Sequence, residues 1–508
     1  MKYLCCKQNI ILLMILSLSN FVSLASDLTN VKSPNKQQLP NFLVIIVDDL
    51  GFMDIAANNP NTFYQTPNIN QLAKESTNFS NSYAANPVCS PSRVALMTGI
   101  NPAKINATDW FHHKNGKRLS GTYQVANSID YLPHSTTTIA EALPAHYQTS
   151  FIGKWHLGED EKYWPANQGF DSNIAGWSSG SPRGGYFAPY KNPRLAQGVK
   201  GEYLTERLTN EAIEQLAYIT DDPFLMVLSY YSVHVPLQAP SSTVAKYQQR
   251  SADHRNSVNF AEEEQVLPQN KKPRKVRIKQ NHPTYAAMVE HMDANVGRVL
   301  AELNRSGLDK NTVVIFTSDN GGLSTSEGSP TSNLPYRGGK GWIYEGGIKV
   351  PLIVKIPETG LQNKIVKTPV IGMDIPATIL ALANVKIANL DGKSLLPLMR
   401  GTENEIHAAQ RPLFWHYPHY SNQGGVPAAA VRLGEFKLIQ RLETGKVNLF
   451  NLNNDPGELN DISISFPEKK TQLLNLLTNW YKDVDAQFLK PKANKSPWQL
   501  IGETANAL

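Results

Sequence analysis

Three stretches of the chain are apolar at almost every position. They span residues 41–47, 224–231 and 312–316 and are rich in Val, Ile, Leu and Phe. A strand in the middle of a parallel sheet has both faces covered, so it needs apolar residues throughout rather than at every second position. The pattern therefore predicts three buried strands, each followed in the sequence by polar residues.

Stretches with helical spacing of apolar residues lie between these strands, at about 67–76, 204–218 and 285–303. Alternating strands and helices predict an α/β fold. In open sheets of this kind ligands bind at the carboxyl ends of the strands. Polar residues that follow the three strands are therefore the first candidates for a functional site.

The pattern changes after about residue 400. Short apolar runs separated by Gly- or Asn-rich turns predict a small antiparallel sheet, and residues 468–484 have the spacing of a helix. We therefore expect a large α/β domain over residues 26–400 and a smaller C-terminal α+β domain over residues 401–508. Residues 245–282, acidic and then basic, read as a surface insertion of the large domain, either solvated or in contact with a polyanion.

The N-terminal residues predict export. Lys2 and Lys7 precede an apolar run, and small residues follow it, as in a signal peptide spanning residues 1–25. We expect a periplasmic or secreted protein with no membrane span and no nucleic-acid partner. The net charge of +6 over 508 residues is compatible with a polyanionic ligand.

Cysteine usage is unusual for an exported protein. Of the three cysteines, only Cys89 would remain after removal of the signal peptide, so no intramolecular disulfide can form. A lone thiol is either a small buried apolar residue or a group with a chemical role.

Four oxygen-bearing residues follow two of the predicted strands: Asp48, Asp49, Asp319 and Asn320. If both strands belong to one sheet, these residues can surround a hard divalent cation, and the absence of nitrogen and sulfur ligands favours calcium over zinc. The alternative for each pair is ordinary turn formation at a strand end.

Cys89 precedes a short apolar stretch and is expected at the N-terminus of a helix, where amide dipoles favour an anion. Ser90 is a candidate cap, with Pro91 at the first helical position. The sequence Cys89-Ser90-Pro91-Ser92-Arg93, followed by Thr98-Gly99, resembles the signature of the type I formylglycine-dependent sulfatases.

Further blocks carry the same resemblance in the same order. Residues 153–158, the His-x-Pro segment at 234–236 and the glycine-rich loop at 336–347 each resemble a block of that family, although the first two alone would be read as structural. The matched blocks run from about residue 41 to 351, with weaker ones at 374–378 and 454–458. The resemblance implies a fold related to alkaline phosphatase: a large mixed sheet between helix layers, and a smaller domain with a four-stranded antiparallel sheet and a helix.

The resemblance also implies roles for particular residues. Cys89 would be converted to the formylglycine nucleophile by a formylglycine-generating enzyme, and one calcium ion would be held by residue 89 together with Asp48, Asp49, Asp319 and Asn320. Lys154 and Lys340 would neutralise sulfate oxygens, and Arg93 would orient the nucleophile. His234, as imidazolium, would act as general acid, and His156 as general base.

Substrate contacts are expected from residues outside the shared blocks. The candidates are Asp109, Trp110, Arg183, His416 and His419, with His112, His113, Tyr186 and Tyr420 as further ones; ordinary packing is the alternative for the aromatic and histidine residues. The resemblance is nearest to sulfatases of carbohydrates, such as oligosaccharides of ulvan or carrageenan-like galactans, or glycosaminoglycans. The alternatives are a phosphodiesterase or phosphonate monoester hydrolase on the same scaffold, and a non-catalytic protein that binds sulfated glycans.

Overall fold

The computed structural model describes residues 39–492 apart from 113–118, 120, 122, 220–221, 252–257, 264–272 and 359. The expected signal peptide, His113 and part of the 245–282 segment lie outside the described residues. Among the helices that are described, none combines the length and the apolar composition needed to cross a membrane.

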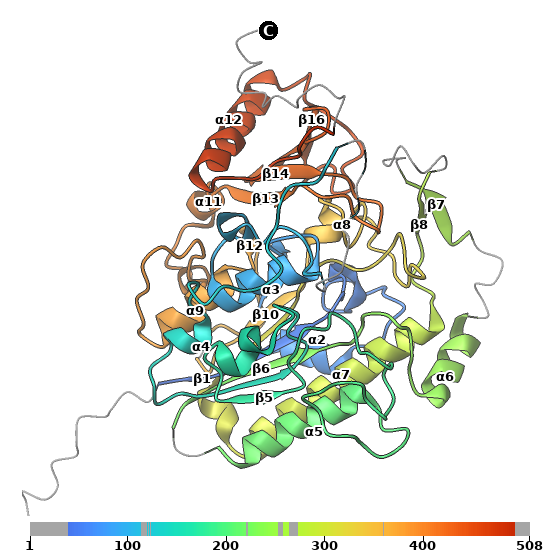
Figure 1. Cartoon of the computed structure of the whole chain (residues 1–508), viewed down its shortest axis with the longest axis vertical. Helices are drawn as coiled ribbons and strands as arrows, with labels where there is room; N and C mark the ends of the chain where they lie inside the picture. Colours follow the sequence, from blue (N-terminus) through green and yellow to red (C-terminus); the bar gives the residue numbers. More distant parts are fainter. Residues whose placement is uncertain are drawn as a thin grey trace, which may run out of the picture. The chain divides into compact units, whose positions relative to one another are not determined.

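An eight-stranded mixed sheet forms the centre of the fold (Figure 1). Its order is β11-β2-β10-β9-β1-β6-β4-β5, and only β10 runs antiparallel to its neighbours. The strands are β1 (Asn41–Val47), β2 (Thr77–Phe79), β4 (Gln148–Gly153), β5 (Ser172–Ile174), β6 (Phe224–Tyr230), β9 (Thr312–Ser318), β10 (Leu352–Lys355) and β11 (Lys364–Val366). The three strands predicted from apolar runs are adjacent at its centre, and every residue of all three is buried.

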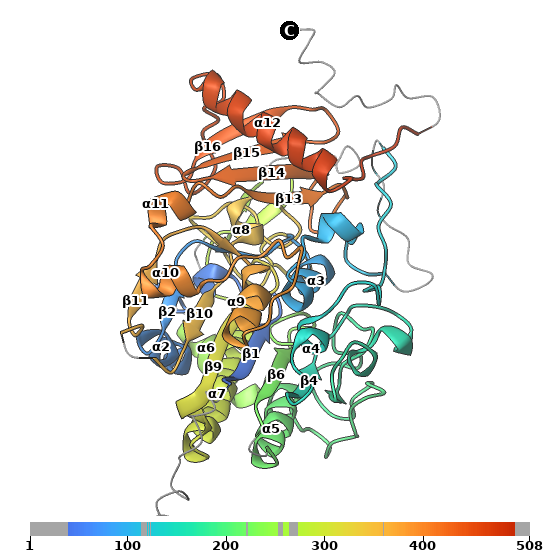
Figure 2. The same ribbon diagram turned by 90° about the vertical axis from the view of Figure 1, so that its left-hand side faces the viewer.

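Helices cover both faces of this sheet (Figures 1 and 2). One layer contains α2 (Pro67–Lys74), α5 (Leu204–Ala217), α6 (Ser241–Ser251) and α7 (Pro283–Arg305), and the other contains α3 (Cys89–Thr98), α4 (Ile139–Ala142) and α9 (Asp374–Leu382). Side chains from alternate positions of β1 and β6 form one core with α2, α5 and α7. The two covered faces explain why these strands are apolar at successive positions.

The C-terminal part forms a second, four-stranded antiparallel sheet in the order β13-β14-β15-β16. The strands are β13 (Leu413–Tyr417), β14 (Ala428–Leu433), β15 (Phe436–Arg441) and β16 (Val447–Asn451), and α12 (Pro467–Asp483) packs on one face. The other face packs on residues 342–348, which include α8 (Glu345–Ile348). This confirms the predicted fold class. Other short elements are β3 (Ser82–Tyr83), β12 (Val370–Ile371), α10 (Leu396–Arg400) and α11 (Glu405–Ala408).

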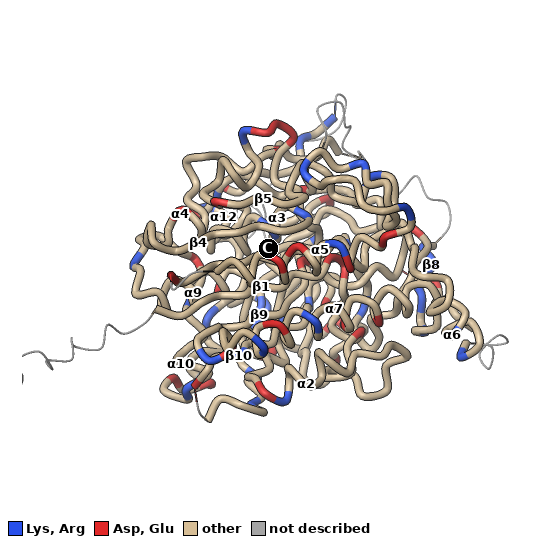
Figure 3. The backbone as a smooth tube through the Cα atoms, turned by 90° about the horizontal axis from the view of Figure 1, so that it is seen from below, with Lys and Arg blue, Asp and Glu red and all other residues tan. Residues whose placement is uncertain are grey.

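The described parts of the 245–282 segment contain regular structure in addition to the expected surface loop. It contains the end of α6 and an antiparallel pair of strands, β7 (Phe260–Glu262) and β8 (Lys275–Arg277). Arg277 is buried and donates to the carbonyl of Ser329. All residues of β7 are exposed and burial increases steadily along β8, so neither strand has the alternation by which a strand is predicted from sequence. Figure 3 shows that basic and acidic residues are interspersed along the outer loops and helices rather than divided between two halves.

Candidate active site

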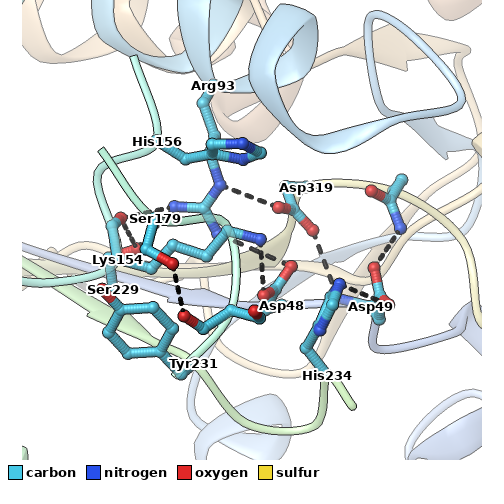
Figure 4. Close-up of polar contacts among 12 residues, drawn as sticks. Asp48, Asp49, Arg93, Lys154, His156, Ser179, Ser229, Tyr231, His234 and Asp319 are labelled. Atoms are coloured by element: carbon cyan, nitrogen blue, oxygen red, sulfur yellow. Dashed lines mark hydrogen bonds and ion pairs between the residues drawn. The ribbon is translucent and has the colours of Figure 1, made fainter. Parts of the chain in front are cut away.

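The carboxylates that follow β1 and β9 meet at the carboxyl ends of these two central strands (Figure 4). Val47 and Ser318 are partners in register at the ends of these parallel strands, so the residues that follow them emerge side by side. The backbone N–H of Asp49 donates to Oδ1 of Asp319 over 3.2 Å. Asp49 has a φ of 59°, a left-handed conformation that costs roughly 1–3 kcal/mol outside glycine. Such strain is typical of functional sites.

This group of side chains fits a divalent cation. One carboxylate oxygen of Asp48 (Oδ1) and the amide oxygen of Asn320 (Oδ1) are buried and, among the described residues, have no hydrogen-bond partner. Ligand atoms of Asp48, Asp319 and Cys89 lie within 4.8 Å of one another. Buried polar atoms normally have hydrogen bonds, and the ion pair of Asp48 Oδ1 with Arg93 is long at 3.9 Å. Two such oxygens beside other carboxylates indicate a ligand position. Oxygen donors of this kind suit a hard cation.

Helix α3 brings Cys89 and Arg93 to the same cluster. The two residues are four positions apart and therefore lie on one face of the helix. Arg93 is buried; its Nε donates to Asp319 over 2.8 Å and its Nη1 donates to Ser229 over 2.8 Å. Burial raises the pKa of the Cys89 thiol despite the nearby Lys154 and Lys340, so the unmodified side chain is a poor nucleophile at neutral pH.

The expected capping role of Ser90 is wrong. Helix α3 begins at Cys89, and the preceding Val88 is the N-cap without a side-chain hydrogen bond. Ser90 instead accepts the N–H of Phe111 over 2.9 Å and lies 3.3 Å from Nδ1 of His156. It therefore joins the helix to the loop of His156.

Two buried lysines lie beside the carboxylates. Lys154 Nζ is 2.6 Å from Asp48, and Lys340 Nζ is 2.9 Å from Asp49. Burial raises the pKa of Asp48 well above its ordinary value, with Lys154 opposing the rise. Burial also disfavours the charged form of Asp319, but Arg93, Lys154 and Lys340 together hold the pKa of Asp319 below its ordinary value.

Glycines let the loop of Lys340 approach the end of β9. A Cβ at Gly339 would lie 2.4 Å from the carbonyl oxygen of Gly322, and a Cβ at Gly321 would lie 2.0 Å from that of Gly346. Both distances are too short for any other residue, so backbone packs directly on backbone here. The N–H of Lys340 donates to Gly322, which fixes the lysine above the cluster.

The two histidines differ in which ring nitrogen is available. Nε2 of His156 lies 3.2 Å from the carbonyl of Phe111, which can only accept, so Nδ1 is the acceptor atom. By the same reasoning, Nδ1 of His234 donates to the carbonyl of Val235, and Nε2 faces Asp49 at 3.7 Å. Burial, with Lys154 adding to it, lowers the pKa of His156 well below its ordinary value.

The neutral form of His234 is favoured in this arrangement. Burial and the neighbouring Lys340 lower the pKa of His234 to about 3. The expected imidazolium is therefore not the form that these neighbours stabilise.

Comparison with known proteins settles the family. A model described as "Sulfatase" matches residues 40–385, and one described as "N-sulphoglucosamine sulphohydrolase, C-terminal" matches residues 338–486. The chain belongs to the sulfatase family. Its members hydrolyse sulfuric esters, so this sulfatase is an enzyme of that class.

The similar proteins include sulfatases from bacteria and mammals. The sulfatase is 27% identical to a "Sulfatase" of Formosa agariphila over 91% of each chain. It is 28% identical to the N-acetylgalactosamine-6-sulfatase of Mus musculus, over 86% of this chain and 79% of that protein. The structure of Ps i-CgsB in complex with k-i-k-neocarrahexaose has a TM-score of 0.70 and 27% identity, and the match covers 92% of this chain and 96% of that one.

A pocket of about 360 Å³ opens above Cys89 in the sulfatase. His156, His234 and Lys340 line it, as do Trp110 and Arg183, two of the expected substrate contacts. Sequence analysis missed the other polar residues of the wall: Ser179, Ser181, Glu327, Asn422 and Gln423. They lie in loops without periodicity, and no feature of the sequence singles them out.

Two other expected substrate contacts, Asp109 and His419, are not in the pocket lining but lie next to the segment that carries Trp110. Asp109 is buried and accepts the N–H of Trp110 over 2.9 Å. His419 is buried and pairs with Thr108 over 2.9 Å, with its Nδ1 3.7 Å from Asp109. Among the further candidates, the ring of His112 packs on Trp110 with centroids 3.7 Å apart.

His416 does not line the pocket. It packs against Trp480, Tyr481 and Phe488 beside α12, and its Nε2 lies 2.7 Å from the carbonyl of Gln487. Successive residues of β13 point to opposite faces, so Trp415 faces the large domain while His416 faces α12. Two further candidates are likewise structural: Tyr186 donates to the carbonyl of His234, and Tyr420 donates to Glu443.

Proposed function

We propose that this sulfatase releases sulfate from a sulfated carbohydrate bound in the pocket above Cys89. The observation that carries the proposal is the mixed lining of this pocket. Cys89, Lys340 and two histidines line it beside the buried carboxylates, and an exposed indole, Trp110, and hydrogen-bonding side chains line it as well. Aromatic faces and polar groups together are suited to sugar rings.

The relatives support the same substrate class. One similar structure was solved with a neocarrahexaose, and one similar protein is named for N-acetylgalactosamine 6-sulfate chemistry. We propose oligosaccharides of sulfated algal polysaccharides, of the carrageenan-like or ulvan type, or glycosaminoglycans as substrates. We also propose export to the periplasm or beyond, as the N-terminal residues predict.

We propose calcium as the bound cation, held by Asp48, Asp49, Asp319, Asn320 and an oxygen on residue 89. When bound, such a cation polarises the ester and the nucleophile. Conversion of Cys89 to formylglycine would supply two hydroxyl oxygens on one carbon after hydration. Because Cys89 is only 4% exposed, a formylglycine-generating enzyme has to act before the chain folds.

The remaining residues have positions that suit the roles expected for them. Lys154 and Lys340 can neutralise sulfate oxygens, and Arg93 holds the carboxylate of Asp319 against α3. His234 lines the pocket, and in the expected role of general acid it would first take up a proton on Nε2 and then give that proton to the leaving oxygen. His156 Nδ1 is the acceptor nitrogen that a general base requires.

Sulfate release tests the proposal. The protein, co-expressed with a formylglycine-generating enzyme, is incubated with a panel of sulfated algal and animal oligosaccharides, and Cys89→Ala serves as control. Release by the wild type that falls to background in the control supports the proposal. Turnover of phosphodiesters or phosphonate esters in place of sulfate esters would favour the hydrolase alternative. Tight binding of sulfated glycans without release would favour the non-catalytic one.

A further inference from the structure

The pocket proposed to bind a sulfate ester has a carboxylate, that of Glu327, in its wall. Glu327 lies in the loop between β9 and the glycine-rich loop, is exposed, and lines the pocket with Lys340 and Arg183. It acts electrostatically on Lys340. A negative charge here repels a sulfate ester, so its presence calls for a favourable contact with another part of the substrate.

Glu327 is held in place from the smaller sheet. Asn422 donates to Oε1 of Glu327 over 2.6 Å, and Gln423 donates to the same oxygen over 2.9 Å. Both amides belong to the loop between β13 and β14. That loop is itself fixed, because Arg274 donates to the carbonyl of Asn422 and Thr325 donates to that of Gln423, each over 2.7 Å.

The arrangement leaves one oxygen of the carboxylate for a ligand. In the part of the chain that the structure describes, both hydrogen bonds to the side chain end on Oε1, and none involves Oε2. The backbone of Glu327 has a φ of 52°, which is costly for a residue other than glycine. A fixed, strained carboxylate with an available oxygen is an acceptor for hydroxyl donors. A second sulfate or a carboxylate on the substrate has no proton to donate.

We propose that Glu327 determines substrate specificity by accepting a hydrogen bond from a free hydroxyl group beside the reacting sulfate ester. The enzyme then prefers a sugar ring with a hydroxyl group at that position over one with a second sulfate or a carboxylate there. This inference rests on the proposed carbohydrate sulfatase function and adds the kind of ring that the pocket takes.

The test compares Glu327→Gln with the wild type on matched sugar sulfates. The substrates share one reacting ester and carry at the neighbouring carbon a hydroxyl group, a hydrogen or a second sulfate. Glutamine keeps a carbonyl oxygen for Asn422 and Gln423 but removes the charge and replaces Oε2 with a donor. We expect kcat/KM for the hydroxyl substrate to fall about 10- to 100-fold, the range for a hydrogen bond to a charged group. The doubly sulfated substrate should gain at least tenfold relative to the hydroxyl substrate.

A matched control exists in the smaller sheet. Glu435 also accepts hydrogen bonds from two side-chain amides on one oxygen, from Asn451 over 3.0 Å and Asn453 over 3.3 Å, and it is not among the residues that line the pocket. Glu435→Gln should leave the three kcat/KM values unchanged.

The outcomes separate the two proposals. Equal loss on all three substrates in Glu327→Gln would mean that Glu327 only fixes the loop, and would overturn the inference. Failure of the wild type to release sulfate from any sugar, with aryl sulfates still hydrolysed, would overturn the carbohydrate proposal and the inference with it.

Discussion

This sulfatase has two clusters of buried charged residues that are built from the same residue types but differ in their roles. The pocket cluster contains Asp48, Asp49, Asp319, Arg93, Lys154 and Lys340. The sheet–loop cluster, between the small sheet and α8, contains Glu345, Glu458, Lys437 and Tyr83. In the second, Lys437 lies 3.0 Å from Glu345 and 2.9 Å from Glu458.

The clusters differ in what their oxygens contact. In the sheet–loop cluster Glu345 accepts the hydroxyl of Tyr83 over 2.6 Å, and its own N–H donates to Glu458 over 2.6 Å. Beside the pocket cluster, Oδ1 of Asn320 has no hydrogen-bond partner among the described residues, and Oδ1 of Asp48 has only a long ion pair of 3.9 Å with Arg93. Oε1 of Glu458 also accepts no hydrogen bond there, but it lies 2.9 Å from Lys437. A cluster that closes on itself can fix two segments together, whereas one with unpartnered oxygens is arranged for a ligand. The first should therefore matter for stability and the second for chemistry.

The largest expected effect is on stability, from Lys437→Met. Removing the lysine takes away the cation that Glu345 and Glu458 share, although Arg432 remains 4.0 Å from Glu345. Breaking a buried pair in this way costs about 3–5 kcal/mol. Urea unfolding measures the loss. Lys446→Met in the next turn, where the side chain is exposed, should change the free energy of unfolding by less than about 0.5 kcal/mol. Equal midpoints for the two variants would contradict the structural role of the cluster.

Lys154→Met should affect mainly catalysis. Loss of one group that stabilises charge on the reacting ester lowers kcat by about 10²–10³-fold. The stability loss should be smaller than for Lys437→Met, because Lys154 pairs with one carboxylate, Asp48, whereas Lys437 pairs with two. Rates on a sulfate ester and urea unfolding are measured together, with exposed Lys162→Met as control. A stability loss as large as that of Lys437→Met would remove the distinction between the clusters.

The sheet–loop cluster also predicts a pH dependence. Burial, together with Glu345 close by, raises the pKa of Glu458 from 4.5 to about 7, although Lys437 opposes the rise. An acid whose pKa is raised on folding stabilises the folded state below its unfolded pKa, and this stabilisation is lost as pH rises from about 4.5 to 7. The effect is smaller than that of Lys437→Met because it changes the protonation of one carboxyl group, whereas the substitution removes a cation shared by two carboxylates.

Unfolding of the wild type and Glu458→Gln across this pH window isolates the contribution. Asp54, whose pKa burial raises to about 6, is present in both proteins and cancels in the difference. A difference in unfolding free energy that stays constant from pH 4.5 to 7 would show that Glu458 does not titrate there.

The pocket cluster was far easier to predict from sequence than the sheet–loop cluster. Asp48, Asp49 and Asp319 follow apolar strands, so strand-end geometry predicts that they meet. Arg93, Lys154 and Lys340 were expected only from the family resemblance. Lys437 and Glu458 lie in short segments of a small sheet, where only the tertiary fold shows that they meet Glu345. Of the pocket wall, Trp110 and Arg183 were predicted, whereas its other polar residues lie in loops without periodicity and were missed. His416 was placed wrongly because the alternation of β13 turns it towards α12.

The smallest expected effect concerns the cation. Calcium that binds only the folded protein raises its stability by about 1.4 kcal/mol at ten times the Kd, which thermal unfolding detects as a rise in Tm. The protein is used with Cys89 unmodified, so the shift is independent of activity. Asp48→Asn should lose most of the shift, because it removes a carboxylate with an unpartnered oxygen, whereas Lys437→Met should retain it despite a lower starting Tm. Equal shifts in the wild type and Asp48→Asn would place the cation elsewhere, and the unpartnered oxygens would then have another explanation.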